Sequence, residues 1–241
     1  MIGTILNAAG ILVGGLVGLT GRKSLSAANE SFFKVTLAAV TVLCGLRLTW
    51  MSLSGSFPHM LKQLLIVILA LMLGKLTGRL LQLQRMSNHL GRAASERIGR
   101  AVPSNPRRFS DGFKTCTALF CAAPLGILGA LLEGLSSRQF YPLAVKAVMD
   151  GLAAMGFISL FGRGVLFSAF PVLAVQGTIT LVSARFLEPF LTAHALLEPV
   201  NATGGLLIFS VALVMLGLKR IELADYLPSL AFAPLLTWLW R

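Results

Sequence analysis

Two oppositely charged side chains lie four residues apart within an apolar stretch of the chain. Lys146 and Asp150 belong to Tyr141–Phe161, which is long enough to cross a bilayer as a helix. Residues at this spacing share one helix face and can form a salt bridge. A charge at the centre of a membrane costs about 2.5–3.5 kcal/mol on insertion scales. The pair has two interpretations: a salt bridge that lets the helix insert, or a site where Asp150 binds a cation or proton and Lys146 tunes it.

A second group of candidate residues lies in the next apolar stretch, Val165–Phe186, and at its edge. Proline frees a backbone carbonyl, and in a membrane such groups are tolerated only inside protein or along a wet cavity. We expect helix interruptions at Gly164, Pro171 and Gly177. Ser168 and Gln176 then line a substrate or ion site beside the charged pair. The alternatives are a plain proline kink and hydrogen bonds between helices, which are the commoner use of intramembrane Ser and Gln.

Asn7 and Asn201 occupy similar contexts, NAAGIL and NATGGLL. Each is a candidate for substrate or ion binding, although capping of its own helix would suffice to explain it. The segments Ala8–Arg22 and Ala122–Arg138 are also alike. A unit with an odd number of spans comes out upside down when repeated, and inverted repeats are typical of secondary transporters. An inverted repeat of three-helix units is therefore one interpretation, and chance similarity between Gly-, Ala- and Leu-rich segments is the other.

The composition indicates an integral membrane protein. Of the 241 residues, 56% are hydrophobic and 12% are charged, whereas soluble domains have about 45–50% and about 25%. Lysine and arginine (21) outnumber aspartate and glutamate (9), which gives a formal net charge of +12. The basic residues cluster in loops beside apolar stretches, so they fit membrane topology and anionic headgroups rather than nucleic acid.

Apolar stretches of spanning length predict an all-α polytopic helical membrane protein with seven or eight transmembrane helices. The last stretch is short, with about 14 residues, and whether it spans is open. Glu133, near the outer end of the fourth span, is expected to be an interface charge. The predicted spans are Ile2–Leu19, Phe33–Leu53, Met60–Leu81, Phe113–Leu135, Tyr141–Phe161, Val165–Phe186, Ala202–Leu218 and Leu227–Trp240.

A basic loop at residues 83–112 divides a single membrane domain into a first helical unit (1–82) and a second unit with C-terminal helices (113–241). The loop begins with an amphipathic helical pattern, which two prolines at 103 and 106 end. Its positive charge places it in the cytoplasm by the positive-inside rule. The residues expected to contact lipid headgroups are Arg92, Arg97, Arg100, Arg107 and Arg108.

The remaining patterns are less specific. Gly14 and Gly18 have the small-residue spacing that lets helices approach closely, which fits either internal packing or a homo-oligomer. Cys44, Cys116 and Cys121 lie in apolar stretches without CxxC spacing, so a disulfide framework is not expected. The sequence carries no motif for a metal, a cofactor or a nucleophile, and we expect no metal site, no cofactor and no enzyme.

Five sequence blocks resemble one family. They are MIGTILNAAGILVGGLVGL, TALFCAAPLGILGALLEGL, KAVMDGLAAMGF, GVLFSAFPVLAVQGTITL and GGLLIFSVALVMLGLKRIELADYLPSL. In this order they are similar to the bacterial inner-membrane family of unknown function that includes YqgA and YdfK. The resemblance implies a multi-pass protein of the bacterial inner membrane, in a family often described as candidate transporters without a settled substrate. The family's motifs fall on Asp150-Gly151, Ser168-Ala169, Pro171 and Gln176-Gly177.

These patterns predict an ion-coupled transporter of a small solute or ion, with Asp150, Lys146 and Gln176 between the fifth and sixth spans. Its expected partners are anionic lipids and the unknown solute or ion, without nucleic acid. One alternative is a channel, which needs no alternating access. Another is a non-transporting scaffold or stress-response protein that acts through the basic loop. An intramembrane enzyme ranks last.

Overall fold

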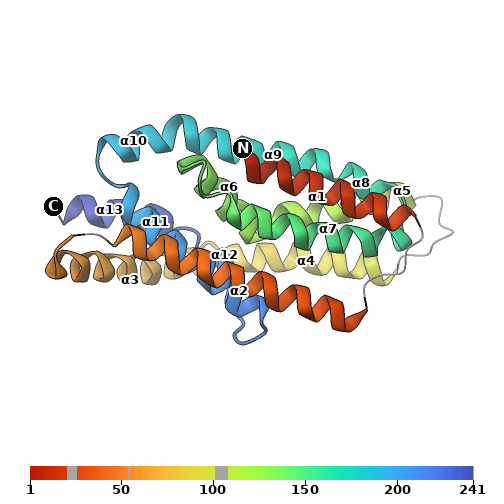
Figure 1. The fold of residues 1–241 in the computed structure, drawn as a ribbon, viewed down its shortest axis with the longest axis horizontal. Helices are drawn as coiled ribbons and strands as arrows, with labels where there is room; N and C mark the ends of the chain where they lie inside the picture. Colours follow the sequence, from red (N-terminus) through yellow and green to blue (C-terminus); the bar gives the residue numbers. More distant parts are fainter. Residues whose placement is uncertain (21–25, 54, 101–107, 241) are drawn as a thin grey trace. The chain divides into compact units, whose positions relative to one another are not determined.

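The computed structural model describes residues 1–20, 26–53, 55–100 and 108–240, and within these ranges the chain is helical without strands (Figure 1). This confirms the predicted all-α fold. Six of the described helices are long and apolar enough to cross a membrane, and a bent pair raises the number to seven. Large apolar side chains such as Leu43, Trp50 and Leu76 are exposed, which suits contact with lipid rather than with water.

The chain forms two compact units, and each combines segments from both halves of the sequence. The first unit contains Met1–Ser31 and Ser87–Leu181, and the second contains Phe32–Met86 and Val182–Arg241. The units therefore differ from the predicted division at residues 82 and 113. The physical reason is that the first helix of the chain packs against a helix from the later half.

The first unit is built around α1 (Ile2–Leu19) and α7 (Tyr141–Phe161). It also contains most of α4 (Leu83–Gly99), then α5 (Arg108–Ala122), α6 (Pro124–Leu135), α8 (Gly164–Phe167) and α9 (Ala169–Val182) up to Leu181. Its apolar core draws buried side chains from five helices, among them Ile11, Phe120, Phe161, Val165 and Val172.

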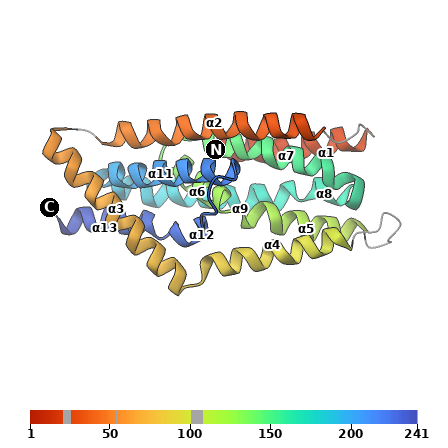
Figure 2. The ribbon, with the colours of Figure 1, turned by 90° about the horizontal axis from the view of Figure 1, so that it is seen from below.

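Small residues set the distance between α1 and α7, which lie side by side (Figure 2). Gly10 faces Ala147, Gly14 faces Gly151 and Gly18 faces Met155, so the two helices run parallel. A Cβ atom on Gly14 would lie 1.9 Å from the carbonyl oxygen of Gly151, so the backbones touch directly. The small-residue spacing of Gly14 and Gly18 therefore serves packing within the unit.

The fourth predicted span, Phe113–Leu135, is not a straight helix. It is the bent pair α5 and α6, whose axes differ by 58° across a break before Pro124. Pro124 is the first residue of α6, where its missing N–H costs no hydrogen bond and its fixed φ suits a helix start. The sharp break therefore lies in the fourth span, where no interruption was predicted.

The sixth predicted span belongs to a 30-residue helical stretch, Gly164–Ala193. The interruption predicted at Pro171 lies at Ser168, whose N–H bonds the Val165 carbonyl three residues back at 3.1 Å. The proline ring crowds the carbonyl four residues before it, so the irregularity falls one turn earlier. Gly164 begins α8 directly after a turn, as predicted, but Gly177 lies inside α9 and interrupts nothing.

The second unit contains α2 (Ala27–Ser52) from Phe32 onward, α3 (Phe57–Leu80), a π-helical turn (Ser183–Leu187), α10 (Glu188–Ala193), α11 (Leu197–Met215), α12 (Leu223–Tyr226) and α13 (Ser229–Leu239). Gly74 and Gly78 on α3 meet the backbone of Ser229 and Asp225, so α3 packs closely on α12 and α13. The last apolar helix, Leu223–Leu239, falls short of spanning length.

Candidate ion- and substrate-binding site

Lys146 and Asp150 form a buried salt bridge on α7, as their spacing predicts. The relative exposure is 2% for Lys146 and 8% for Asp150, so neither charge is shared with solvent. The Lys146 ammonium also lies 5.8 Å from the centre of the Phe120 ring on α5, a cation–π distance. The pair has no net charge, but each side chain needs the other as its counter-charge.

Asn7 and Gln176 extend this polar group across two further helices. The Asn7 amide nitrogen on α1 donates to the Gln176 side-chain oxygen on α9 at 3.1 Å. Asn7 also interacts electrostatically with Asp150. Both amides are buried, and each keeps one polar atom without a partner, Asn7 Oδ1 and Gln176 Nε2. A buried polar atom without a partner costs about 1–3 kcal/mol, so such atoms point to a ligand, an ion or water.

The break between α5 and α6 lies beside these residues. A Cβ atom on Gly126, in the first turn of α6, would lie 2.9 Å from Lys146 Cε and 3.0 Å from Gln176 Nε2. Cys121, two residues before the break, interacts electrostatically with both members of the charged pair. Four elements therefore converge here: α1 through Asn7, α7 through the pair, α9 through Gln176, and the broken helix.

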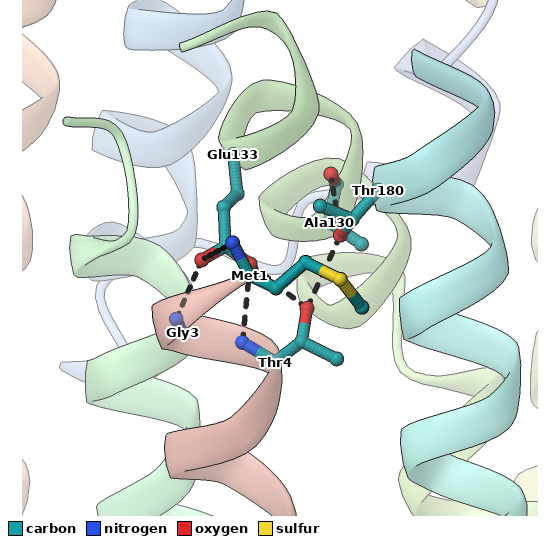
Figure 3. Close-up of polar contacts among 6 residues, drawn as sticks. All are labelled: Met1, Gly3, Thr4, Ala130, Glu133 and Thr180. Carbon is teal, nitrogen blue, oxygen red and sulfur yellow. Dashed lines mark hydrogen bonds and ion pairs between the residues drawn. The ribbon is translucent and has the colours of Figure 1, made fainter. Parts of the chain in front are cut away.

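A second buried polar cluster joins α1, α6 and α9 (Figure 3). Glu133 accepts hydrogen bonds from the backbone N–H groups of Gly3 at 2.6 Å and Thr4 at 3.1 Å, and from the Thr4 hydroxyl at 2.8 Å. Its Oε1 also lies 3.3 Å from the Met1 nitrogen. The Thr180 hydroxyl contacts that of Thr4 and donates to the Ala130 carbonyl.

Glu133 is thus not the interface charge expected from its position. It is 2% exposed and satisfies the first N–H groups of α1, where a negative charge is stabilised by the helix dipole. The intramembrane carboxylate was visible in the sequence. Its bond with Thr4 was not, because Thr4 is an ordinary side chain of an apolar helix and lies 129 residues from Glu133 in sequence.

Two predicted site residues are not part of this group. Ser168 is buried, but its hydroxyl donates to the Val165 carbonyl of its own helix at 2.6 Å. Asn201 belongs to the second unit, where it lies on α11 and its side-chain oxygen is buried without a partner. The structure therefore brings together Asp150, Lys146, Gln176 and Asn7 of the six residues predicted to bind substrate or ion.

The arginines predicted to contact headgroups have different surroundings. Arg92, Arg97 and Arg100 are exposed, and Arg92 also lines a groove of about 410 Å³ between α4 and α5. Arg108 instead donates to the carbonyls of Ile158, Ser159 and Leu160, the last turn of α7. A cation there satisfies the free carbonyls at the helix end, so Arg108 is a structural cap. Arg107 lies outside the described residues.

Within the described part of the chain, no three His, Cys, Asp or Glu side chains gather as metal ligands would. The group's available chemistry is that of a carboxylate, an ammonium, two amides and a helix end. Together with the apolar spans, this buried polar group belongs to a polytopic helical membrane protein.

The chain belongs to the family described as "Protein of unknown function (DUF554)", whose model matches residues 2–238. It is 27% identical over 234 residues to the "Uncharacterized membrane protein YdfK" of Bacillus subtilis (strain 168), covering 97% of this chain and 94% of that protein. It is 28% identical over 244 residues to the "Uncharacterized protein YqgA" of Escherichia coli (strain K12), covering 100% and 97%. The resemblance of the sequence blocks is thereby confirmed. No solved structure matches the chain.

Proposed function

We propose that the protein is an ion-coupled transporter of a small solute or ion, with Asp150 as the residue that takes up the coupling ion. One observation carries the proposal: the buried Lys146–Asp150 pair lies beside a broken helix and beside two amide atoms without partners. Ionisable groups inside a membrane are costly and mark ion or substrate pathways. Broken helices near the middle of a span are the usual substrate-binding element of secondary transporters.

The neutrality of the pair supports a coupling role. When Asp150 takes up a proton, the Lys146 ammonium loses its counter-charge in surroundings that penalise a lone charge. The pair then favours either release of the proton or a conformation that gives Lys146 a new partner. A transporter needs such a two-state element, whose equilibrium the bound ion shifts. The two buried amide atoms without partners beside the pair favour a ligand-binding role over a salt bridge with structural function only.

The protein is proposed to lie in the bacterial inner membrane. One end of the first unit, which carries Arg108 and the C-terminus of α7, is proposed to face the cytoplasm. The parallel course of α1 and α7 supports this proposal, because alternating the predicted spans places both N-terminal ends on the outer side. The proposal also includes an inverted repeat, which is supported only by the similarities within the sequence.

The test is solute-driven proton movement in proteoliposomes that contain a pH-sensitive dye. Wild-type protein should change the internal pH when a gradient of one member of a panel of inorganic ions and small metabolites is imposed. Asp150→Asn should abolish the response to that solute, whereas Asp111→Asn, which removes a charge from the half-buried first turn of α5, should keep it. A response of equal size in Asp150→Asn would contradict the site assignment.

A further inference from the structure

Two side chains reach the first turn of α6 from two different helices. Gln176 places its Nε2 amide nitrogen next to Gly126, and Lys146 places its Cε methylene there, one bond from the ammonium that is paired with Asp150. α6 has 12 residues and begins at the break, so the positive end of its dipole lies there. Pro124 has no N–H group and the Gly126 N–H is bonded to the Ala123 carbonyl at 2.8 Å, so the dipole rather than a row of free N–H groups is what this end offers. A helix N-terminus of this kind favours a negative charge.

Gln176 supplies a second observation that points to a ligand. It is 1% exposed, and its Nε2 atom has no hydrogen-bond partner although it lies 3.0 Å from the position of a Cβ atom on Gly126. An amide N–H group buried next to a helix N-terminus can be satisfied only by an acceptor. The Thr180 hydroxyl, on the same helix as Gln176, is engaged with Thr4 and Ala130.

We propose that the first turn of α6, Gln176 Nε2 and the Lys146 ammonium form a binding site for a small inorganic or carboxylate monoanion, of the size of chloride or formate. This proposal rests on the proposed function and names the substrate class of the same site. The size follows from the close packing at Gly126: a Cβ atom there would lie 2.9 Å from Lys146 Cε, so the flexible end of Lys146 must move aside, and this admits only an anion of a few atoms.

The charge balance links the anion to the proton. With Asp150 ionised, Lys146 is neutralised and an added anion would leave the site with one excess negative charge. With Asp150 protonated, Lys146 is free and one monoanion restores neutrality. One proton and one monoanion therefore bind together, and their joint transport is electroneutral.

The other groups that face the pair are the Cys121 thiol on α5 and the neutral Asn7 and Gln176 on α1 and α9, while Glu133 on α6 is bound to the start of α1.

The test is thermal unfolding of the purified protein in detergent with sodium chloride or sodium formate, against sodium gluconate at equal ionic strength. In the wild type we expect chloride or formate to raise the Tm by about 5 °C at a hundredfold excess over its Kd, more at pH 5 than at pH 8. Asp150→Asn mimics the protonated carboxyl and should bind the anion at least tenfold more tightly at pH 8.

Two glycine variants on the same helix provide the matched comparison. Gly126→Ala places a methyl group against Lys146 and Gln176 and should abolish the anion response. Gly129→Ala places it against Leu143 and Pro142 and should keep the response. The proposal is overturned if neither anion raises the Tm of the wild type, or if Gly126→Ala responds like Gly129→Ala. Asp150-dependent proton flux without an anion response would overturn the anion site alone, whereas anion binding without any flux would overturn only the transporter.

Discussion

At the scale of single residues, the molecule depends on charges that are buried in pairs. Lys146 has Asp150 as its counter-charge, and Glu133 has the start of α1. Removing one member of a buried pair leaves an uncompensated charge, whereas removing both members is often nearly neutral for stability. Stability and transport can therefore be separated experimentally at the Lys146–Asp150 pair.

We expect Lys146→Met to lower the free energy of unfolding by about 3–5 kcal/mol, because Asp150 loses its partner. The double variant Lys146→Met with Asp150→Leu should recover most of this loss and remain without transport. Unfolding in detergent, followed by circular dichroism, measures both. Lys114→Met, at an exposed position on α5, is the control and should change stability by less than about 0.5 kcal/mol. A double variant as unstable as the single one would refute the coupling.

The charged pair could be predicted because its signal is local. Two charges four residues apart in an apolar helix must meet, whatever the rest of the fold does. Gln176 and Asn7 could be named as candidates, but their hydrogen bond could not, because it joins residues 169 positions apart. The surroundings of Glu133 and Arg108 were missed for the same reason, since each is satisfied by groups distant in sequence.

At the scale of elements, glycines decide how closely helices approach. The contact between α1 and α7 leaves no room for a side chain at Gly14, since a Cβ atom would lie 1.9 Å from the Gly151 oxygen. By contrast, Gly156, also on α7, has no heavy atom within 4 Å of its Cβ position.

Gly14→Ala should therefore destabilise the protein, because two backbones would have to separate and lose their packing, at a cost of about 1–3 kcal/mol or more. Gly156→Ala, the matched control, should be neutral or stabilising by up to about 1 kcal/mol, since alanine favours a helix more than glycine does. The midpoints of denaturant unfolding of the two variants measure this difference. Equal midpoints would show that the α1–α7 contact does not depend on Gly14.

The break between α5 and α6 shows where sequence reasoning stops at this scale. A proline inside an apolar segment can kink a helix, start a new helix or lie within a continuous one. The local sequences around Pro124 and Pro171 do not distinguish between these outcomes. The structure starts a helix at Pro124 and keeps a nearly continuous helix through Pro171. Tertiary packing decides between these outcomes, because the freed backbone groups must find partners in other helices.

At the scale of the whole molecule, the all-α architecture and the order of its apolar helices could be predicted, because about 20 apolar residues must span a bilayer whatever their partners. The predicted number, seven or eight, is met only at seven, because the last apolar helix of the described residues falls short of spanning length. The grouping of the helices could not. Two compact units interleave along the chain, with the first helix in one unit and most of the second in the other. That grouping depends on contacts between distant segments, which composition and spacing do not encode.

The central claim, that Asp150 belongs to a site open alternately to the two sides of the membrane, has a native reporter in Cys121, which is half-buried beside the pair. We would measure its rate of reaction with a membrane-impermeant thiol reagent in right-side-out and inside-out vesicles, with Cys44 and Cys116 replaced by serine. A transporter predicts reaction from both sides, with Asp150→Asn raising one rate and lowering the other. Rates that change together would indicate a channel. No reaction from either side, while a Ser137→Cys control reacts, would contradict transport through this site.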